Sequence, residues 1–341
     1  MEVLVTGGAG YLGRHLITAL QARGDSVRAL ILPGEDTTWL EKRDVCLNVG
    51  DVRQPETLRT AARGADGIFH LAAMTGVWRP MRDYYAVNVT GTENVCMAAL
   101  DAGVPRLVHV SSAIVYPVLA RQTITETTPL APLREQYPLS KAEGDRAVQR
   151  MVLRYGLPAV IVRPGSIYGP GDRVNFERTA ERLRAGKGLV IGSGGNAVSF
   201  VYITDVVQGL LLALDQKCAP GQIYNITNDQ FVSQQELLWA IAEGVGTRPP
   251  RIHVPYRALY ALALVAEQIA TVTGYRRPPF LTRIGVQIFG ADTRHSIDKA
   301  RRELGYAPRV RLHEGVRVAS EWYLKAREPA LSNAGVPAGA G

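Results

Sequence analysis

The pattern of apolar and polar residues predicts alternating strands and helices through the first half of the chain. Residues 2–5 are mostly apolar, as in a buried strand, and residues 11–23 repeat apolar positions at helical spacing. Further strands are predicted at residues 26–32, 44–47, 67–71, 106–111 and 158–163, and helices at 56–63, 85–102 and 137–155. Strands that alternate with helices in this way predict an α/β fold with a doubly wound parallel sheet.

The second half of the chain is less regular, and we expect it to have a different role. Helices are predicted near residues 174–185, 204–215, 233–244 and 256–273, and short strands near 188–191, 200–203, 222–226 and 251–254. We expect residues 1–170, joined by elements returning from about 200–226, to form a dinucleotide-binding domain. Residues 171–327 are expected to form mainly a smaller substrate-binding lobe, and residues 328–341, rich in Ala, Gly and Pro, a disordered tail.

Three segments of this half carry predictions of their own. The loop 164–172 has too many Gly and Pro residues for a regular element, so we expect it to shape the mouth of a pocket. Asp205 opens a predicted helix, where a capping role is enough to explain it. Residues 256–273 are apolar on nearly all sides. A buried helix is the favoured interpretation, and a wall of an apolar substrate site or a peripheral membrane contact are the alternatives.

A glycine-rich segment joins the first strand to the first helix. Residues 6–13 read Thr-Gly-Gly-Ala-Gly-Tyr-Leu-Gly, in which Gly7, Gly10 and Gly13 are evenly spaced and Gly8 starts a second, overlapping template. Glycine lets the backbone approach an anion closely, and a helix N-terminus offers unpaired N–H groups with a positive dipole end. Because the run lies between a strand and a helix, it predicts binding of a dinucleotide pyrophosphate.

Hydroxyl and amino side chains follow at places suited to proton transfer. Ser111 and Ser112 end the strand at 106–111, at the edge where open parallel sheets bind ligands. Tyr137 and Lys141 share one helical face. A lysine ammonium one turn away, with a positive nicotinamide ring, is expected to lower the tyrosine pKa from near 10. Tyr137 would then exchange a proton with an alcohol or ketone, Ser112 would position the substrate oxygen, and Lys141 would hold the nicotinamide ribose.

Two strand ends leave alternatives open. The second strand ends in Ile-Leu-Pro at residues 31–33, with neither the acid that reads the ribose of NAD nor the Arg that reads the phosphate of NADP. Glu35 and Asp36 follow shortly, so NAD is slightly favoured over NADP. His70 ends the fourth strand, where a packed histidine is favoured over a catalytic one.

Composition and charge exclude several classes of protein. The formal charge is +8, from 39 basic and 31 acidic residues, but the 33 Arg residues are scattered, so we expect no nucleic-acid partner. Cys46, Cys96 and Cys218 are far apart and form no metal or disulfide pattern, so we expect no metal and a reduced, cytoplasmic protein. The sequence shows no signal peptide and no run of apolar residues long enough for a membrane span.

Together these motifs resemble the extended short-chain dehydrogenase/reductases over roughly residues 1–327. The resemblance implies a Rossmann domain with a C-terminal substrate lobe, and a catalytic set of Ser112, Tyr137 and Lys141. It implies that the cofactor is bound by Gly7, Gly10, Tyr11, Leu12, Gly13, Asp51, Val52, Leu71, Ala72, Ala73, Asn88, Tyr137, Lys141 and Pro164. It implies that the substrate is bound by Met74, Ser112, Tyr137 and Ser166.

Within this superfamily the C-terminal part looks like the 3β-hydroxysteroid dehydrogenase-like branch, which includes sterol dehydrogenases and bacterial 2-alkyl-3-ketoalkanoate reductases. Residues 255–257, 278–283 and 304–308 carry this likeness. Nucleotide-sugar epimerases and dehydratases usually have Asn where this chain has Ser166. They also have a diphosphate-gripping Arg where it has Val198. A diphosphate needs charge-assisted partners, so this departure counts against a sugar nucleotide.

We therefore expect an NAD(P)-dependent oxidoreductase that interconverts a secondary alcohol and a ketone on a bulky, largely apolar small molecule, sterol-like or 3-keto acid-like. The wall of the substrate site would come from residues 74–81 and the helix at 256–273. A nucleotide-sugar 4-epimerase or dehydratase using the same Ser-Tyr-Lys set, and a cofactor-sensing protein without catalysis, are the alternatives. The resemblance also implies a homodimer, built from two helices of each copy.

Overall fold

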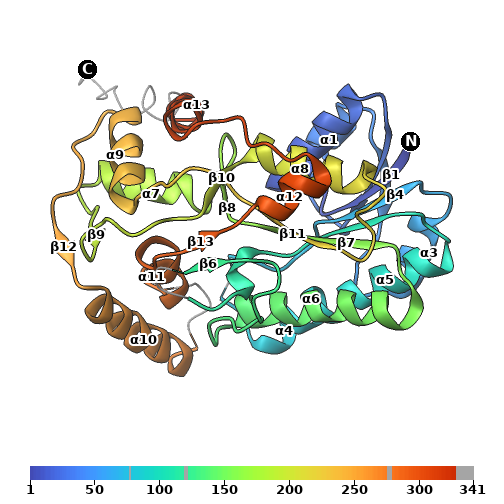
Figure 1. Ribbon diagram of the computed structural model, residues 1–341, viewed down its shortest axis with the longest axis horizontal. Coiled ribbons are helices and arrows are strands. Elements are labelled where there is room, and N and C mark those ends of the chain that lie inside the picture. The colour runs from blue at the N-terminus through green and yellow to red at the C-terminus, as the bar shows by residue number, and fades with distance from the viewer. Residues whose placement is uncertain (77, 119–121, 275–278, 328–341) are drawn as a thin grey trace, which may run out of the picture.

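The computed structural model describes residues 1–76, 78–118, 122–274 and 279–327, arranged as Figure 1 shows. The tail expected at residues 328–341 lies outside the described residues, as does Pro278 of the C-terminal motif.

Among the described residues, seven parallel strands form one central sheet, in the order β11-β7-β5-β4-β1-β2-β3. Near-continuous apolar runs form these strands because helices cover both faces of the sheet. The strands are β1 Glu2–Thr6, β2 Ser26–Ile31, β3 Cys46–Val49, β4 Gly67–His70, β5 Leu107–Val110, β7 Ala159–Pro164 and β11 Ile223–Ile226. The predicted doubly wound parallel sheet is confirmed.

Alternating side chains of β1 build two separate cores. Val3 and Val5 belong to the cluster of buried side chains under helices α1 and α8, whereas Leu4 belongs to the cluster under α3, α5 and α6. Figure 1 shows the two helical layers on opposite faces of the sheet. The helices are α1 Tyr11–Ala22, α3 Pro55–Ala62, α5 Gly91–Asp101, α6 Gln136–Tyr155 and α8 Ile203–Asp215.

The other elements include short parallel strand pairs and helices, most of which lie to the left of the sheet in Figure 1. The pairs are β8 (Ser166–Tyr168) with β10 (Phe200–Tyr202), β9 (Val190–Ile191) with β12 (His253–Val254), and β6 (Thr123–Ile124) with β13 (Arg294–His295). The helices are α2 Thr38–Glu41, α4 Met81–Tyr85, α7 Phe176–Arg184, α9 Gln234–Gly244, α10 Tyr256–Val272, α11 Arg283–Gly290, α12 Asp298–Leu304 and α13 Leu312–Lys325.

The structure corrects three local predictions. The loop 164–172 does contain a regular element, because Ser166 donates its backbone N–H to the Ser199 carbonyl (2.7 Å) and starts β8. The helix predicted at 85–102 is broken by a π-helical turn, η1 (Ala86–Thr90), between α4 and α5. Asp205 does not cap α8. Its carboxylate accepts hydrogen bonds from the distant backbone N–H groups of Arg309 (2.9 Å) and Val310 (3.2 Å).

Helix α10 is not the buried helix that its apolar sequence predicted. Its buried residues form one narrow stripe, Leu259, Ala263, Glu267 and Ala270, and most of its other side chains are exposed. The stripe is enough to hold the helix against α11, so the remaining apolar residues need no partner within the fold. None of the helices among the described residues is long and apolar enough to cross a membrane.

Candidate active site

Segments that follow parallel strands meet at the carboxyl edge of the sheet, in the spatial order of the strands. Asp51 follows β3, the glycine turn follows β1, residues 71–73 follow β4, Ser112 follows β5, and Pro164 ends β7. The structure therefore places the predicted site residues in one row, with Asp51 at one end and Pro164 at the other.

The turn between β1 and α1 has no room for side chains at its glycines. Gly7 has a φ of +73°, and a Cβ there would lie 2.9 Å from the backbone nitrogen of Ala72. A Cβ at Gly13 would lie 2.7 Å from the Cα of Gly8. Gly10 is the N-cap of α1, and no side chain caps the free N–H groups of that helix. A close-packed turn at an uncapped helix N-terminus fits the pyrophosphate of a dinucleotide.

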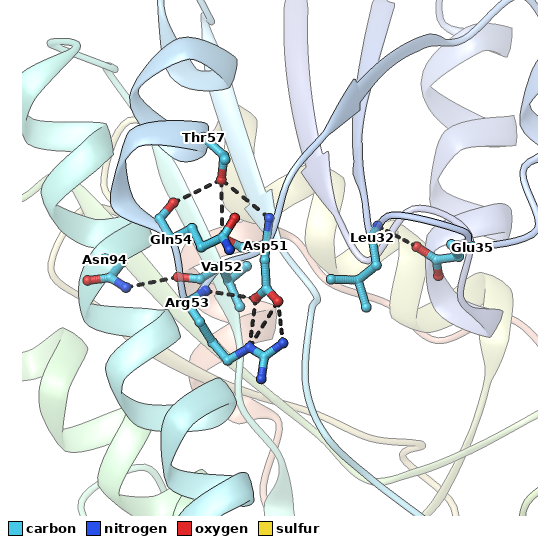
Figure 2. A network of polar contacts seen from close by, with 8 residues as sticks. All are labelled: Leu32, Glu35, Asp51, Val52, Arg53, Gln54, Thr57 and Asn94. Carbon is cyan, nitrogen blue, oxygen red and sulfur yellow. Dashed lines mark hydrogen bonds and ion pairs between the residues drawn. The ribbon is translucent and has the colours of Figure 1, made fainter.

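Figure 2 shows the ends of β2 and β3, where the adenosine half of a dinucleotide is expected. The Arg53 guanidinium donates to both carboxylate oxygens of Asp51 (Oδ1 at 3.0 Å and Oδ2 at 2.5 Å), and these hydrogen bonds lower the pKa of Asp51. The Val52 carbonyl accepts from the Asn94 amide (2.9 Å). Leu32, 48% exposed, directly follows β2, and the Glu35 carboxylate accepts a hydrogen bond from its backbone N–H (3.0 Å).

Asn88 fixes the segment after β4 against the helix that carries Tyr137. It lies in the π-helical turn η1 and is 1% exposed. Its side-chain oxygen accepts from the Met74 backbone N–H (2.7 Å), and its nitrogen donates to the Met74 carbonyl (3.1 Å) and to Ser140 Oγ (2.9 Å). The π-helical turn therefore holds Met74 beside α6. Such turns are frequent at functional sites.

Ser112, Tyr137 and Lys141 lie together where β5 meets α6. The Tyr137 hydroxyl lies beside the hydroxyls of Ser112 and Thr75, and both of them act to lower its pKa. Lys141 is 4% exposed and donates to the carbonyl of Val110 (2.7 Å), two residues before Ser112. Sequence reasoning missed Thr75, although it directly follows Met74 in the segment predicted to line the substrate site.

Burial determines the titration of this group. Burial raises the pKa of Tyr137, opposed by the hydrogen bonds from Ser112 and Thr75. Burial outweighs these effects, and Lys141, whose ammonium donates to the Val110 carbonyl, is not among the groups that lower the pKa of Tyr137 in the absence of a nicotinamide ring. Burial also lowers the pKa of Lys141 to about 8, and the carboxylate of Asp145, one helical turn on, opposes that shift.

His70 is a packed residue, as predicted. Its ring nitrogens are hydrogen-bonded to Thr6 Oγ1 (2.8 Å) and Thr92 Oγ1 (3.0 Å), and its ring lies 5.2 Å from that of His109. Burial lowers the pKa of His70 to about 3, so the ring is neutral at physiological pH. A histidine with both nitrogens occupied and no charge has no role in proton exchange here.

A buried ion pair behind the site was not predicted from the sequence. Arg163 on β7 donates two hydrogen bonds to the carboxylate of Asp145 on α6 (both 2.8 Å), and it donates a third to the hydroxyl of Tyr116 (2.7 Å). Tyr116 in turn donates to the side chain of Asn225 on β11 (2.8 Å). This network ties the helix of Tyr137 and Lys141 to the sheet. The one available signal was that Asp145 follows Lys141 by four residues.

A cavity of about 240 Å³ opens beside the start of α6, and its lining includes Trp78, Met81, Glu135, Gln268, Thr271 and Arg283. Residues 74–81 and α10 therefore do share a cavity, but α10 lines it with polar side chains. Burial, with the nearby Glu267 carboxylate, raises the pKa of Glu135 to about 7. Ser166 lies elsewhere, at the start of β8 and half-buried. Among the described residues, no group of three or more His, Cys, Asp or Glu could hold a metal ion.

The fold and the row of site residues define an NAD-dependent enzyme of the extended short-chain dehydrogenase/reductase class. The family model described as "NAD dependent epimerase/dehydratase family" matches residues 3–227, and the chain belongs to that family.

Named relatives cover nearly the whole chain. The 4-hydroxy-2-methyl-3-oxo-4-farnesyl-3,4-dihydroquinoline-1-oxide ketoreductase of Stigmatella aurantiaca is 34% identical, over 93% of this chain and 95% of the relative. The 2-alkyl-3-oxoalkanoate reductase of Stenotrophomonas maltophilia is 31% identical, over 93% and 98%. The crystal structure of the dTDP-glucose 4,6-dehydratase DesIV of Streptomyces venezuelae, with NAD bound, has a TM-score of 0.76 and 28% identity, covering 96% of this chain and 99% of that one.

Proposed function

We propose that this enzyme interconverts a secondary alcohol and a ketone on a bulky, largely apolar molecule, with Ser112, Tyr137 and Lys141 as the catalytic set. The observation that carries the proposal is that the Tyr137 hydroxyl lies beside the Ser112 hydroxyl near the carboxyl edge, while Lys141, on the same face of α6, donates to the carbonyl of Val110 at the end of β5. Two hydroxyls at one point suit a substrate oxygen that gains or loses a proton.

The cofactor would lie along the carboxyl edge of the sheet. The glycine turn, with Tyr11, Leu12 and Gly13 at the start of α1, would hold its pyrophosphate, and Asp51 and Val52 would meet its adenosine. Residues 71–73, Asn88 and Pro164 would line the nicotinamide half. When bound, the dinucleotide accepts the hydride from the carbinol carbon or returns it to the ketone carbon. NAD is the proposed cofactor, because no Arg stands at the end of β2 to meet a second phosphate.

Tyr137 and Ser112 would handle the proton. In the oxidation direction the substrate O–H bond breaks and its proton passes to Tyr137, while the C–H bond gives up its hydride and the carbonyl forms. In reduction Tyr137 gives the proton to the carbonyl oxygen. Ser112 would hold that oxygen by a hydrogen bond, and Lys141 would hold the nicotinamide ribose.

The proposed substrate class rests on the relatives and on the cavity. The two relatives are named as reductases of a farnesyl-bearing quinoline oxide and of 2-alkyl-3-oxoalkanoates, and both names include a hydrocarbon substituent. Trp78 and Met81 supply apolar surface in the cavity beside the start of α6. Met74 and Ser166, which do not line that cavity, remain proposed substrate contacts from the family resemblance. Val198 stands where a sugar-nucleotide enzyme carries a diphosphate-binding Arg, and it is buried (3% exposed).

The test compares Tyr137→Phe with Tyr155→Phe, a matched control at the exposed end of the same helix. Turnover of an apolar alcohol or ketone is followed by the absorbance of the reduced nicotinamide. We expect Tyr137→Phe to lose at least about a hundredfold in kcat, the usual worth of an acid/base group, while Tyr155→Phe keeps wild-type rates. Full activity in Tyr137→Phe would remove the proposed proton donor.

Three further properties are part of the proposal. A homodimer would form through α5 and α6, where Met97, Leu153 and Tyr155 are exposed apolar side chains. A cytoplasmic location agrees with three cysteines in no disulfide pattern. The alternative activity, nucleotide-sugar dehydration or epimerisation, draws support from the likeness to DesIV. It would appear as sugar interconversion without net change in the nicotinamide.

A further inference from the structure

Helix α10 presents an apolar face to the outside of the molecule. Leu262, Val265, Ile269 and Val272 follow one another at helical spacing and are 54%, 53%, 59% and 86% exposed. The opposite stripe of the helix packs against α11. Isolated exposed apolar residues are common, but four along one face of a helix indicate a surface that contacts another protein or a membrane.

Within the segment that contains α10, residues 248–274, the exposed charged side chains are all positive. Within residues 248–274 the charged side chains are Arg248, Arg251, Arg257 and Glu267. The three Arg residues are exposed, whereas Glu267 is 3% exposed and paired with Arg283 (2.6 Å). Ile252 (65% exposed) and Phe280 (79% exposed) extend the apolar surface at either end of α10 in the sequence. An apolar face with cations and no exposed carboxylate is the pattern of a helix that lies in an anionic lipid surface.

The same helix reaches the cavity. Gln268 and Thr271, which directly precede Ile269 and Val272 in the sequence, line it together with Trp78 and Met81. One side of α10 therefore faces the outside, and a neighbouring side faces the cavity beside the start of α6. An apolar molecule leaving a lipid surface at α10 would meet this opening first.

We propose that α10 docks the enzyme on an anionic lipid surface, with Leu262, Val265, Ile269 and Val272 inserted among the lipids and Arg248, Arg251 and Arg257 at the headgroups. Lipid fits better than a second copy of the chain, because a second copy would bring the same cations and no exposed carboxylate from this segment to pair with them. Helices α5 and α6, proposed above to form the dimer contact, lie apart from α10 in Figure 1, which leaves α10 free for lipid. Uptake of the substrate from lipid rests on the proposed function; docking itself does not.

The test is co-sedimentation of the full-length protein with vesicles of equal parts phosphatidylcholine and phosphatidylglycerol, without substrate or cofactor. The variant Leu262→Gln/Ile269→Gln is compared with the control Phe231→Gln/Trp239→Gln, which lies outside α10 and outside the proposed dimer contact. All four side chains are exposed, so neither variant alters the core. We expect wild type and control to sediment with the vesicles and the α10 variant to lose about tenfold or more in affinity, because two apolar side chains no longer leave water. Added salt or pure phosphatidylcholine should weaken the wild type.

Three results would overturn the proposal: a wild type that stays in solution with anionic vesicles, an α10 variant that binds them equally, or a wild-type dimer that the α10 variant turns into monomers. The last would show that a second copy covers α10. Turnover of a short, water-miscible substrate should be the same in wild type and the α10 variant. Loss of vesicle binding with that turnover intact separates a failure of docking from a failure of the proposed activity.

Discussion

Replacing Asp145 by Asn tests how the helix of Tyr137 and Lys141 is held. The Asp145 and Arg163 side chains are 0% and 1% exposed and share two hydrogen bonds of 2.8 Å. Removing one charge of a buried pair costs about 3–5 kcal/mol, because the remaining charge is left without compensation. Asn keeps a side-chain oxygen that still accepts from Arg163, so we expect the lower end, a loss of about 3 kcal/mol in the free energy of unfolding.

Urea unfolding of the full-length protein at neutral pH measures this loss. The double variant Asp145→Leu/Arg163→Met removes both charges, and we expect it to be more stable than Asp145→Asn, since no buried charge is left unpaired. A loss below about 1 kcal/mol in Asp145→Asn would refute the reasoning, because an exposed ion pair contributes that much. The pH–rate profile gives an independent readout. Asp145 raises the pKa of Lys141 against burial, so its loss should move the alkaline limb to lower pH.

Three further predictions follow from single residues. Gly13→Ala should lose about tenfold or more in NAD affinity, measured by fluorescence titration, because the added Cβ has no room. Gly195→Ala, whose Cβ would meet nothing nearer than 3.6 Å, should bind NAD normally, and equal affinities of the two variants would refute the close-packed turn. Burial lowers the pKa of His70 from 6.5 to about 3, so the free energy of unfolding of the wild type should fall by up to about 1.4 kcal/mol per pH unit below pH 6.5. His70→Asn should lose less, and parallel pH slopes of the two proteins in urea unfolding would contradict this. Burial and Glu267 raise the pKa of Glu135 from 4.5 to about 7, so the stability of the wild type should fall as pH rises through that window. Glu135→Gln should become more stable relative to the wild type at alkaline pH, and a variant less stable than the wild type at that pH would contradict the cause given.

The features that could be predicted from the sequence are those that depend on local patterns of residues. Apolar runs identified all seven strands of the central sheet, and the glycine turn was recognised from its place between a strand and a helix. Tyr137 and Lys141 were found because their i, i+4 spacing already puts them on one face of a helix. The strand before residue 50 begins two residues later than predicted, after Asp44 adopts a positive φ of 55° that no apolar pattern reports.

The remaining features depend on contacts between distant residues. Asp205 has the sequence position of a helix cap, but its partners lie about a hundred residues on, at Arg309 and Val310. Whether an apolar helix is buried depends on what packs against it, so the composition of α10 could not reveal that one stripe is covered and the other exposed. The pKa of Tyr137 is a related case: the i, i+4 spacing brings Lys141 near, but its ammonium donates to the carbonyl of Val110.

The central claim is net oxidation or reduction of an apolar substrate at Ser112, Tyr137 and Lys141. The most direct measurement is the absorbance of reduced nicotinamide as the full-length enzyme is given NAD, NADP or their reduced forms. A panel of steroid alcohols, 3-keto acids and UDP-sugars supplies the substrates. The account predicts a lasting change in absorbance with an apolar substrate, larger with NAD than with NADP, and absent in Tyr137→Phe. No lasting change with any apolar substrate, together with interconversion of a UDP-sugar in a product assay, would contradict it.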